Sequence, residues 1–215
     1  MIVTIDGPAG AGKSTVARQL ADKLGFDFLD TGAMYRCVAL LGSRQQIDWA
    51  DQPALAAIAA ALPLEFDGAR VLLEGEDVSA EIRTPEVTAL IHYAADNTQV
   101  REAMVALQRK LAAEDDVVTE GRDQGTVDFP HAECKIFLSA SAEERAKRRV
   151  EQMRQAGKEV SVEQVLEQQN LRDQQDEARE IGGLKAADDA LVVITDGMRA
   201  FEVVEHLERL VRIRM

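Results

Sequence analysis

The sequence predicts an α/β fold: a doubly wound parallel sheet of about five strands with helices on both faces. Two observations predict it. Short apolar runs alternate along the chain with longer stretches of helical periodicity, as in parallel strands joined by crossover helices. The first apolar run also leads directly into a glycine-rich loop and a helical stretch, which suits a buried strand. The 215 residues are enough to bury one core.

Each expected element follows from its local pattern, short apolar runs for strands and apolar residues at helical spacing for helices. Strands are expected at Ile2–Ile5, Phe26–Leu29, Val117–Thr119, Lys135–Leu138 and Leu191–Ile194. Helices are expected at Thr15–Leu24, Ala33–Arg44, Gln52–Ala61, Pro85–Ala95, Gln99–Ala113, Ala142–Gln155, Val162–Arg179 and Ala200–Ile213.

One segment interrupts this alternation. Leu64–Glu74 has the pattern of two short strands around an Asp67-Gly68 turn, a strong hairpin signal. The polar stretch Glu76–Arg83 that follows is expected to be irregular. Because a parallel crossover belongs at this point of the chain, we expect an inserted subdomain at about residues 62–97.

Composition narrows the possible partners. The formal net charge of −13 disfavours nucleic acid, which would repel such a surface. Cys37 and Cys134 lack metal or redox spacing, as in a reducing compartment. No apolar run approaches membrane-spanning length, and the first strand leaves no room for a signal peptide. We therefore expect a soluble, cytoplasmic protein that binds neither nucleic acid nor membranes.

The residues between the first strand and the first helix match the phosphate-binding loop pattern in full, Gly-Pro-Ala-Gly-Ala-Gly-Lys-Ser. Its glycines let the backbone turn tightly around an anion, and the helix that follows adds a partial positive charge. Lys13 supplies a mobile charge for the β- and γ-phosphates, and Ser14 offers a hydroxyl to Mg²⁺. The loop predicts a nucleoside triphosphate site made of Gly7, Pro8, Ala9, Gly10, Ala11, Gly12, Lys13, Ser14 and Thr15.

Three further clusters of polar residues narrow the chemistry. Asp30–Arg36 follows the second strand and Glu120–Thr126 follows the third, where a doubly wound sheet presents its binding crevice. Arg172, Asp176 and Arg179 have the spacing of neighbours on one helix face. Taken alone, this triad has two interpretations, a binding site or a solvated stripe of charge.

Together these clusters resemble those of bacterial cytidylate kinases, which phosphorylate CMP and dCMP with ATP. The resemblance runs through nearly the whole chain, with further matching blocks at 74–84, 100–104, 121–126, 135–138 and 144–149. It implies a Mg²⁺-dependent (d)CMP kinase that acts as a monomer. It also implies that the segment 62–97 binds the nucleoside monophosphate and that a helical lid spans about 150–170. The core would then comprise residues 1–61, 98–149 and 171–215.

The resemblance further implies a role for each matching residue. Four are implied to act in catalysis: Lys13 on the ATP phosphates, Arg36 and Arg122 on the CMP phosphate, and Asp123 on the cytosine amino group. The other implied CMP-binding residues are Thr31, Arg101, Arg172, Asp176 and Arg179. The implied lid arginines are Arg145, Arg148 and Arg149. Glu120 matches the acidic residue that orients the Mg²⁺ hydration shell, although a carboxylate at a strand end can also cap a helix.

Two positions depart from the family pattern. His92 stands where these kinases commonly have a serine that touches the sugar, which predicts altered discrimination between CMP and dCMP. The other interpretation is that His92 lies on a helix of the inserted subdomain and faces solvent. Gly182-Gly183 replaces a segment that usually contains proline, which predicts a looser backbone after the triad.

Two other functions stay open at this point. One is a phosphate-loop kinase with a different acceptor, such as UMP or a non-nucleotide. The other is a relative that binds nucleotides with little kinase activity. A switch GTPase is disfavoured because the chain has no Asn-Lys-x-Asp sequence for reading guanine.

Overall fold

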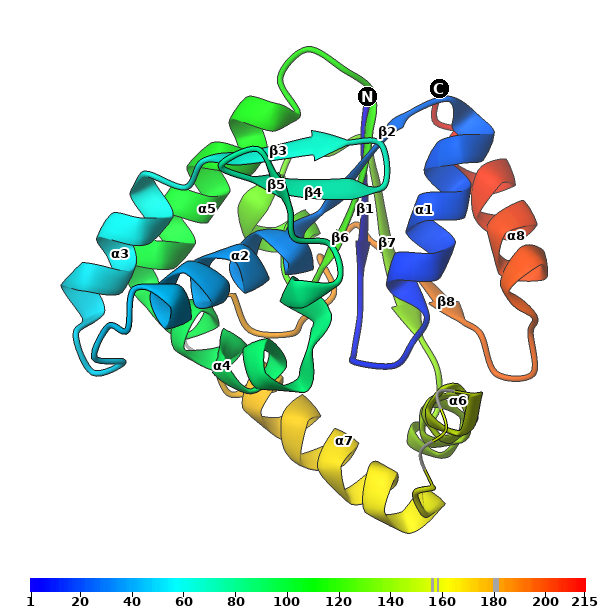
Figure 1. Cartoon of the computed structure of the whole chain (residues 1–215). Helices are drawn as coiled ribbons and strands as arrows, with labels where there is room; N and C mark the ends of the chain where they lie inside the picture. Colours follow the sequence, from blue (N-terminus) through cyan, green and yellow to red (C-terminus); the bar gives the residue numbers. More distant parts are fainter. Residues whose placement is uncertain (156, 158, 180–181) are drawn as a thin grey trace. The chain divides into compact units, whose positions relative to one another are not determined.

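The computed structural model describes residues 1–155, 157, 159–179 and 182–215. These residues form two compact units (Figure 1). The first unit is discontinuous in sequence and consists of Met1–Leu29 and Glu114–Met215. The second is the continuous segment Asp30–Ala113.

The first unit is built on a five-stranded sheet in the order β2-β6-β1-β7-β8. Strand β1 pairs in parallel with β6 and β7, and β7 pairs in parallel with β8. The strands are β1 (Ile2–Asp6), β2 (Asp27–Asp30), β6 (Val117–Gly121), β7 (Cys134–Ser139) and β8 (Leu191–Ile194). The predicted parallel α/β sheet of about five strands is therefore confirmed.

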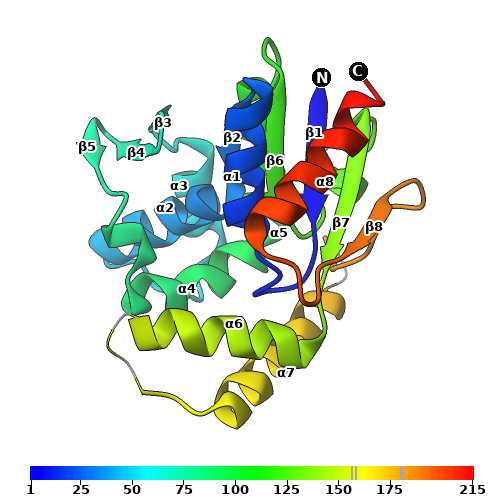
Figure 2. The same ribbon diagram turned by 90° about the vertical axis from the view of Figure 1, so that its right-hand side faces the viewer.

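Four helices accompany this sheet: α1 (Lys13–Leu24), α6 (Ala142–Gln155), α7 (Val162–Glu177) and α8 (Ala200–Arg212). Helices α1 and α8 lie side by side, as Figure 2 shows. Helices α6 and α7 pack on each other through Ala146, Val150 and Val165. A single π-helical turn, Gln124–Asp128, follows β6 and was not expected from the sequence.

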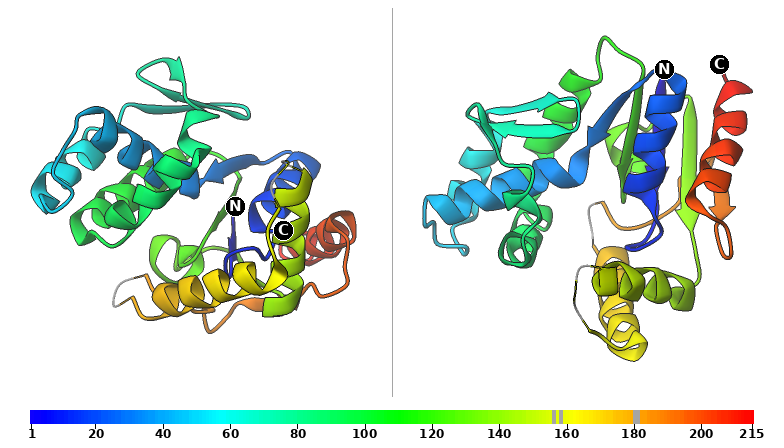
Figure 3. Two further views of the ribbon diagram at one scale, coloured as in Figure 1. Left: turned by 60° about the horizontal axis from the view of Figure 1, so that its bottom comes forward. Right: turned by 45° about the vertical axis from the view of Figure 1, so that its right-hand side comes forward.

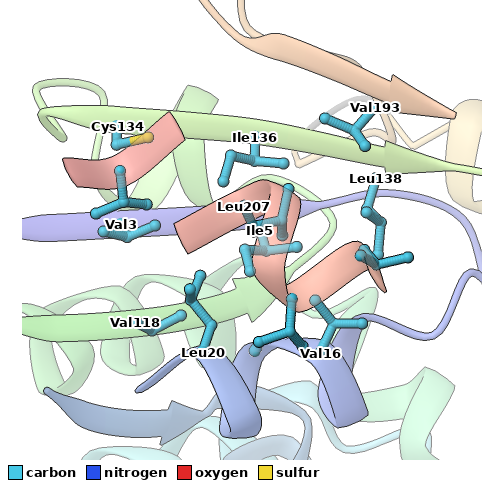
Figure 4. Close-up of a cluster of buried hydrophobic side chains, with 14 of the residues drawn as sticks. Val3, Ile5, Val16, Leu20, Val118, Cys134, Ile136, Leu138, Val193 and Leu207 are labelled. Atoms are coloured by element: carbon cyan, nitrogen blue, oxygen red, sulfur yellow. The ribbon is translucent and has the colours of Figure 1, made fainter. Parts of the chain in front are cut away.

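The main core of this unit lies between the sheet and the pair α1 and α8 (Figure 4). Val3 and Ile5 of β1 are fully buried, as are Leu138 of β7 and Leu207 of α8. Strands covered on both faces are apolar runs and not alternating sequences, and the central strands β1 and β6 are buried along nearly their whole length, whereas Val192 and Ile194 of β8 are exposed. Burying one such Leu or Ile side chain stabilises the fold by about 1.5–3 kcal/mol.

The second unit combines four helices with a small antiparallel sheet. Its helices are α2 (Thr31–Arg44), α3 (Gln52–Ala60), α4 (Pro85–Ala95) and α5 (Thr98–Leu111). Its strands are β3 (Leu64–Asp67), β4 (Arg70–Leu73) and β5 (Glu76–Asp77), and a 3₁₀ helix covers Glu81–Arg83. The predicted hairpin is confirmed, since β3 pairs antiparallel with β4 around the Asp67-Gly68 turn.

Side-chain caps explain where these four helices begin. The carboxylates of Asp30 and Asp51 accept the backbone N–H of Ala33 and Ala54, respectively. Thr84 caps α4 in the same way, and Asn97 caps α5. A short polar side chain at this position satisfies one of the first N–H groups of a helix and stabilises it by about 1 kcal/mol.

The second unit is larger than the segment 62–97 that the sequence marks as an insert. It also includes α2, α3 and α5, because α2 packs on α4 and α3 packs on α5 (Figure 3). The segment 150–170, expected to be the lid, takes in the end of α6 and the beginning of α7. Residues 156 and 158 of that segment lie outside the described residues. None of the helices in the described ranges is long and apolar enough to cross a membrane.

Candidate nucleotide-binding site

The phosphate-binding loop joins β1 to α1 and needs its glycines. Gly7, Gly10 and Gly12 all have positive φ angles, +148°, +78° and +89°. A side chain at Gly7 would overlap the carbonyl oxygen of Leu138 in β7. Gly12 forms the N-cap of α1 and has no side chain, so the first amides of the helix are left for an anionic ligand.

Lys13 begins α1 and is buried. Its ammonium group donates a hydrogen bond to the carbonyl oxygen of Pro8, 2.9 Å away, within the loop itself. Burial lowers the pKa of Lys13 well below the ordinary lysine value, and the positive charge of Arg122 lowers it further. The phosphates of a bound nucleotide would oppose both effects, so ligand binding favours the charged form of Lys13.

Ser14 lies beside Glu120, which ends strand β6 together with Gly121. The Ser14 hydroxyl donates to Oε1 of Glu120 over 2.8 Å. A hydroxyl and a carboxylate are hard oxygen ligands, and Mg²⁺ typically takes one or two such protein groups together with phosphate oxygens and water. The pair therefore fits the Mg²⁺ site expected from the sequence.

Asp176 is the centre of a cluster of arginines in the first unit. It is buried, and its carboxylate accepts from Nε of Arg122 at 2.7 Å and pairs with Arg179 at 2.8 Å. Although burial raises the pKa of Asp176, the charges of Arg122, Arg179 and Arg172 lower it below its ordinary range. Asp176 and Arg179 thus belong to one network with Arg122, which comes from the loop after β6.

The turn that carries Arg122 and Asp123 is held by main-chain bonds. The carbonyl oxygen of Asp123 accepts the backbone N–H groups of Thr126 and Val127, at 3.2 and 2.8 Å. The Asp123 side chain is buried, with 5% of the residue exposed. This turn opens the π-helix Gln124–Asp128, a feature that is frequent at functional sites.

The three arginines of α6 that the sequence singled out have different surroundings. Arg145 is buried and donates to the carbonyl oxygen of Ala9 in the phosphate loop at 2.9 Å. It also pairs with Asp173 of α7 at 2.7 Å. Arg148 donates to the carbonyl oxygen of Thr195 at 2.6 Å, and Arg149 is exposed. Among these three, Arg145 is the arginine with a hydrogen bond to the phosphate loop.

The second unit contains the remaining residues singled out by the sequence. Thr31 is the first residue of α2, and Arg101 is buried on α5. Arg36 of α2 donates to the Thr88 hydroxyl of α4 at 2.7 Å and to the carbonyl oxygen of Ile82 at 3.2 Å. His92 of α4 is exposed, and its Nδ1 lies 2.8 Å from the carbonyl oxygen of Ala89.

Comparison with known proteins identifies the family. The family model described as cytidylate kinase matches residues 3–213. The chain belongs to the cytidylate kinase family. The cytidylate kinase of Rhodopirellula baltica is 54% identical over 212 residues, which cover 99% of this chain and 93% of the relative. That of Geobacter sulfurreducens is 45% identical over 218 residues, which cover 100% and 94%, respectively.

Solved structures agree with the cytidylate kinase fold at lower identity. Shikimate kinase from Bacteroides thetaiotaomicron superposes with a TM-score of 0.53 at 13% identity, covering 99% of this chain and 98% of that one. TT1252 from Thermus thermophilus has a TM-score of 0.50 at 20% identity, with 100% and 97% covered. At such identities the likeness establishes the shared fold.

Three residues that contact the candidate site residues, or the turn that carries Arg122 and Asp123, were not predicted from the sequence. Asp6 ends β1 next to the phosphate loop, a position that could have drawn attention to its carboxylate. Asp173 and Thr88 pair with Arg145 and Arg36 across long sequence separations. No local pattern reveals such pairs, because they depend on how the helices pack.

Proposed function

We propose that this protein transfers the γ-phosphoryl group of ATP to CMP or dCMP, giving CDP or dCDP. The observation that carries the proposal is the match of the cytidylate kinase family model to residues 3–213, almost the whole chain. The proposal is supported by the phosphate loop with Lys13, and by Arg36, Arg122 and Asp123, which are all present at the positions that the family resemblance assigns.

On the donor side, the loop amides and Lys13 bind the triphosphate of ATP. The loop surrounds an anion with N–H groups, and Lys13 adds a full positive charge close to the γ-phosphate. Ser14 would bind Mg²⁺ and Glu120 would orient its hydration shell, and the ion would supply positive charge beside the phosphate oxygens. Phosphoryl transfer needs no covalent protein intermediate, so the task of these residues is to orient the phosphates and stabilise their charge.

On the acceptor side, Arg36 and Arg122 bind the phosphate of CMP. The planar guanidinium group matches two phosphate oxygens at once. Arg122 donates to Asp176 in this structure, so we expect CMP to compete with that carboxylate for the guanidinium group or to share it. Thr31, Arg101, Arg172, Asp176 and Arg179 complete the set of residues proposed to bind the nucleoside.

Asp123 selects the base. An ionised carboxylate accepts a hydrogen bond from the amino group of cytosine, whereas uracil presents a carbonyl oxygen at the same place. Two buried acceptors facing each other are costly, and such a mismatch discriminates between substrates far better than shape does. Asp123→Ala should therefore reduce activity on CMP much more than any activity on UMP.

The proposal extends to the state and location of the enzyme. We infer a monomer that works in the cytoplasm, where ATP and nucleoside monophosphates are at hand. The family resemblance supports the monomer, and two unpaired, buried cysteines support a reducing compartment. Light scattering after size-exclusion chromatography tests the monomer directly.

The test of the proposed function is an ADP-release assay with Mg²⁺ and ATP against CMP, dCMP, UMP, AMP, GMP and dTMP. Turnover confined to CMP and dCMP is the expected result. Lys13→Ala should lower kcat/KM by about 10²–10³ or more, because it removes a charge that stabilises the transition state. Lys23→Ala is the matched control, since Lys23 lies on the same helix and pairs with Glu208 of α8.

The outcomes separate the open functions. Turnover with another monophosphate but not with CMP would show a kinase of different acceptor specificity. Tight CMP binding in calorimetry without any turnover would show a nucleotide-binding relative that lacks the activity. Either result overturns the proposal.

A further inference from the structure

Asp6 connects the phosphate loop with the turn that follows strand β6. It ends strand β1 and directly precedes Gly7, the first residue of the phosphate loop. Only 3% of Asp6 is exposed. Its Oδ1 accepts the backbone N–H of Gln124 and its Oδ2 accepts that of Gly125, both at 2.8 Å. These two amides follow immediately after Arg122 and Asp123.

The contact leaves no spare room. A Cβ atom at Gly125 would lie 2.9 Å from Oγ1 of Thr4 and 3.3 Å from Oδ2 of Asp6. The Gln124 side chain is also engaged, because its Oε1 accepts from the Thr119 hydroxyl at 2.6 Å. The turn after Asp123 is thus seated directly on β1, and a Cβ atom at Gly125 would require Thr4, Asp6 or the turn itself to shift.

Only a carboxylate fits this contact. Two successive amides point at one side chain, and each needs an acceptor. Asparagine has nearly the same shape but offers one acceptor and one N–H₂ donor, so one of the two amides would face a donor. Burying a carboxyl group is costly unless it is well hydrogen-bonded. A buried carboxylate with two main-chain donors at the edge of a binding site is best explained by a positioning role.

We propose that Asp6 is a positioning residue that fixes the turn bearing Arg122 and Asp123 in register with the phosphate loop. This inference rests on the proposed function, in which those two residues bind CMP. Asp6 itself touches neither substrate. It acts through the backbone of Gln124 and Gly125, and its loss should therefore weaken CMP binding more than ATP binding.

Two variants test this from opposite sides of the contact. Asp6→Asn removes one acceptor and the charge. Gly125→Ala keeps the Asp6 carboxylate and displaces the turn through the added Cβ. Val203→Ala, in the core on α8, is the control for lowered stability without contact to the turn. Circular dichroism and thermal melting establish that each variant is folded.

The readouts are the KM values for CMP and ATP and the CMP affinity measured by calorimetry without ATP. We expect both turn variants to weaken CMP binding about tenfold or more, with ATP KM changing less, and Val203→Ala to leave both unchanged. If CMP binding weakens no more than ATP binding in either folded variant, the inference is wrong and Asp6 acts on the phosphate loop or on stability alone. Absence of CMP turnover by the wild-type protein would instead contradict the proposed function.

Discussion

Replacing Asp176 by asparagine tests whether the arginine cluster stabilises the fold. The Asp176 side chain is 4% exposed and contacts two arginines at 2.7 and 2.8 Å. Removing one partner of a buried ion pair costs about 3–5 kcal/mol, because the remaining charge stays buried. Arg122 and Arg179 are each about one-fifth exposed, at 21% and 19%, and can recover some hydration. We therefore expect a loss near the lower limit, about 3 kcal/mol.

The assay is urea and thermal unfolding of the wild type and Asp176→Asn near neutral pH. For a chain of this size, a loss of about 3 kcal/mol lowers Tm by about 6–12 °C. The direction of the lowered pKa also determines how the contribution of Asp176 to stability changes with pH. Since the folded protein lowers the pKa of Asp176, its contribution is present above the pKa of the unfolded chain and is lost as pH falls through the folded value.

Asp67→Asn is the matched control, because Asp67 also pairs with an arginine, Arg70, but both side chains are more than half exposed, at 56% and 60%. Exposed pairs of this kind contribute little. If Asp176→Asn destabilises the protein no more than Asp67→Asn does, then the buried network is no stronger than a surface ion pair and the reasoning fails.

Three further outcomes are expected. Burial raises the pKa of Asp6 from 3.8 to about 6, although its two main-chain hydrogen bonds oppose the shift. Ionising Asp6 to the form that accepts both N–H groups therefore costs stability: folding favours the protonated form by up to about 3 kcal/mol at low pH, and this contribution is lost as pH rises through 6. Denaturant titrations should find the stability of wild type relative to Asp6→Asn highest near pH 4 and lower above pH 6; a constant difference contradicts this. Thr4→Val should raise stability by about 1 kcal/mol, since the buried Thr4 hydroxyl has no hydrogen-bond partner in the described part of the chain; a lower melting temperature would refute it. His92→Ser should change the ratio of kcat/KM for CMP and dCMP if His92 meets the sugar, and an unchanged ratio places it outside the site.

Local signals predicted most of the fold. The helix Pro85–Ala95 and the strand Leu191–Ile194 have the predicted bounds, because Thr84 caps the helix and the strand is a compact apolar run. The π-helical turn Gln124–Asp128 was missed. Its backbone is held by the Asp6 carboxylate, 118 and 119 residues away, and no neighbouring residue indicates it.

In the candidate site, too, local motifs predicted the residues but not their partners from distant parts of the chain. The sequence motif predicted that Lys13 and Ser14 belong to the phosphate loop. In the structure both lie at its end, where they begin helix α1. They could not say that Arg122 meets Asp176, 54 residues further along, or that Arg145 pairs with Asp173. A motif shows which residues are present. Their partners from distant parts of the chain depend on how the elements pack, and the contribution of each pair to stability depends on its burial.

The chain order within the sheet has a consequence for folding during synthesis. Strand β1 lies between β6 and β7, yet Met1 and its ion-pair partner Asp116 are 115 residues apart. At about 5–20 residues per second, β1 waits roughly 6–23 s before its first neighbour, β6, is made, and longer before β7 is made. The continuous segment Asp30–Ala113 can collapse during that interval. An apolar strand without a partner is prone to mispairing, so we expect nascent chains to depend on chaperones until β6 and β7 emerge.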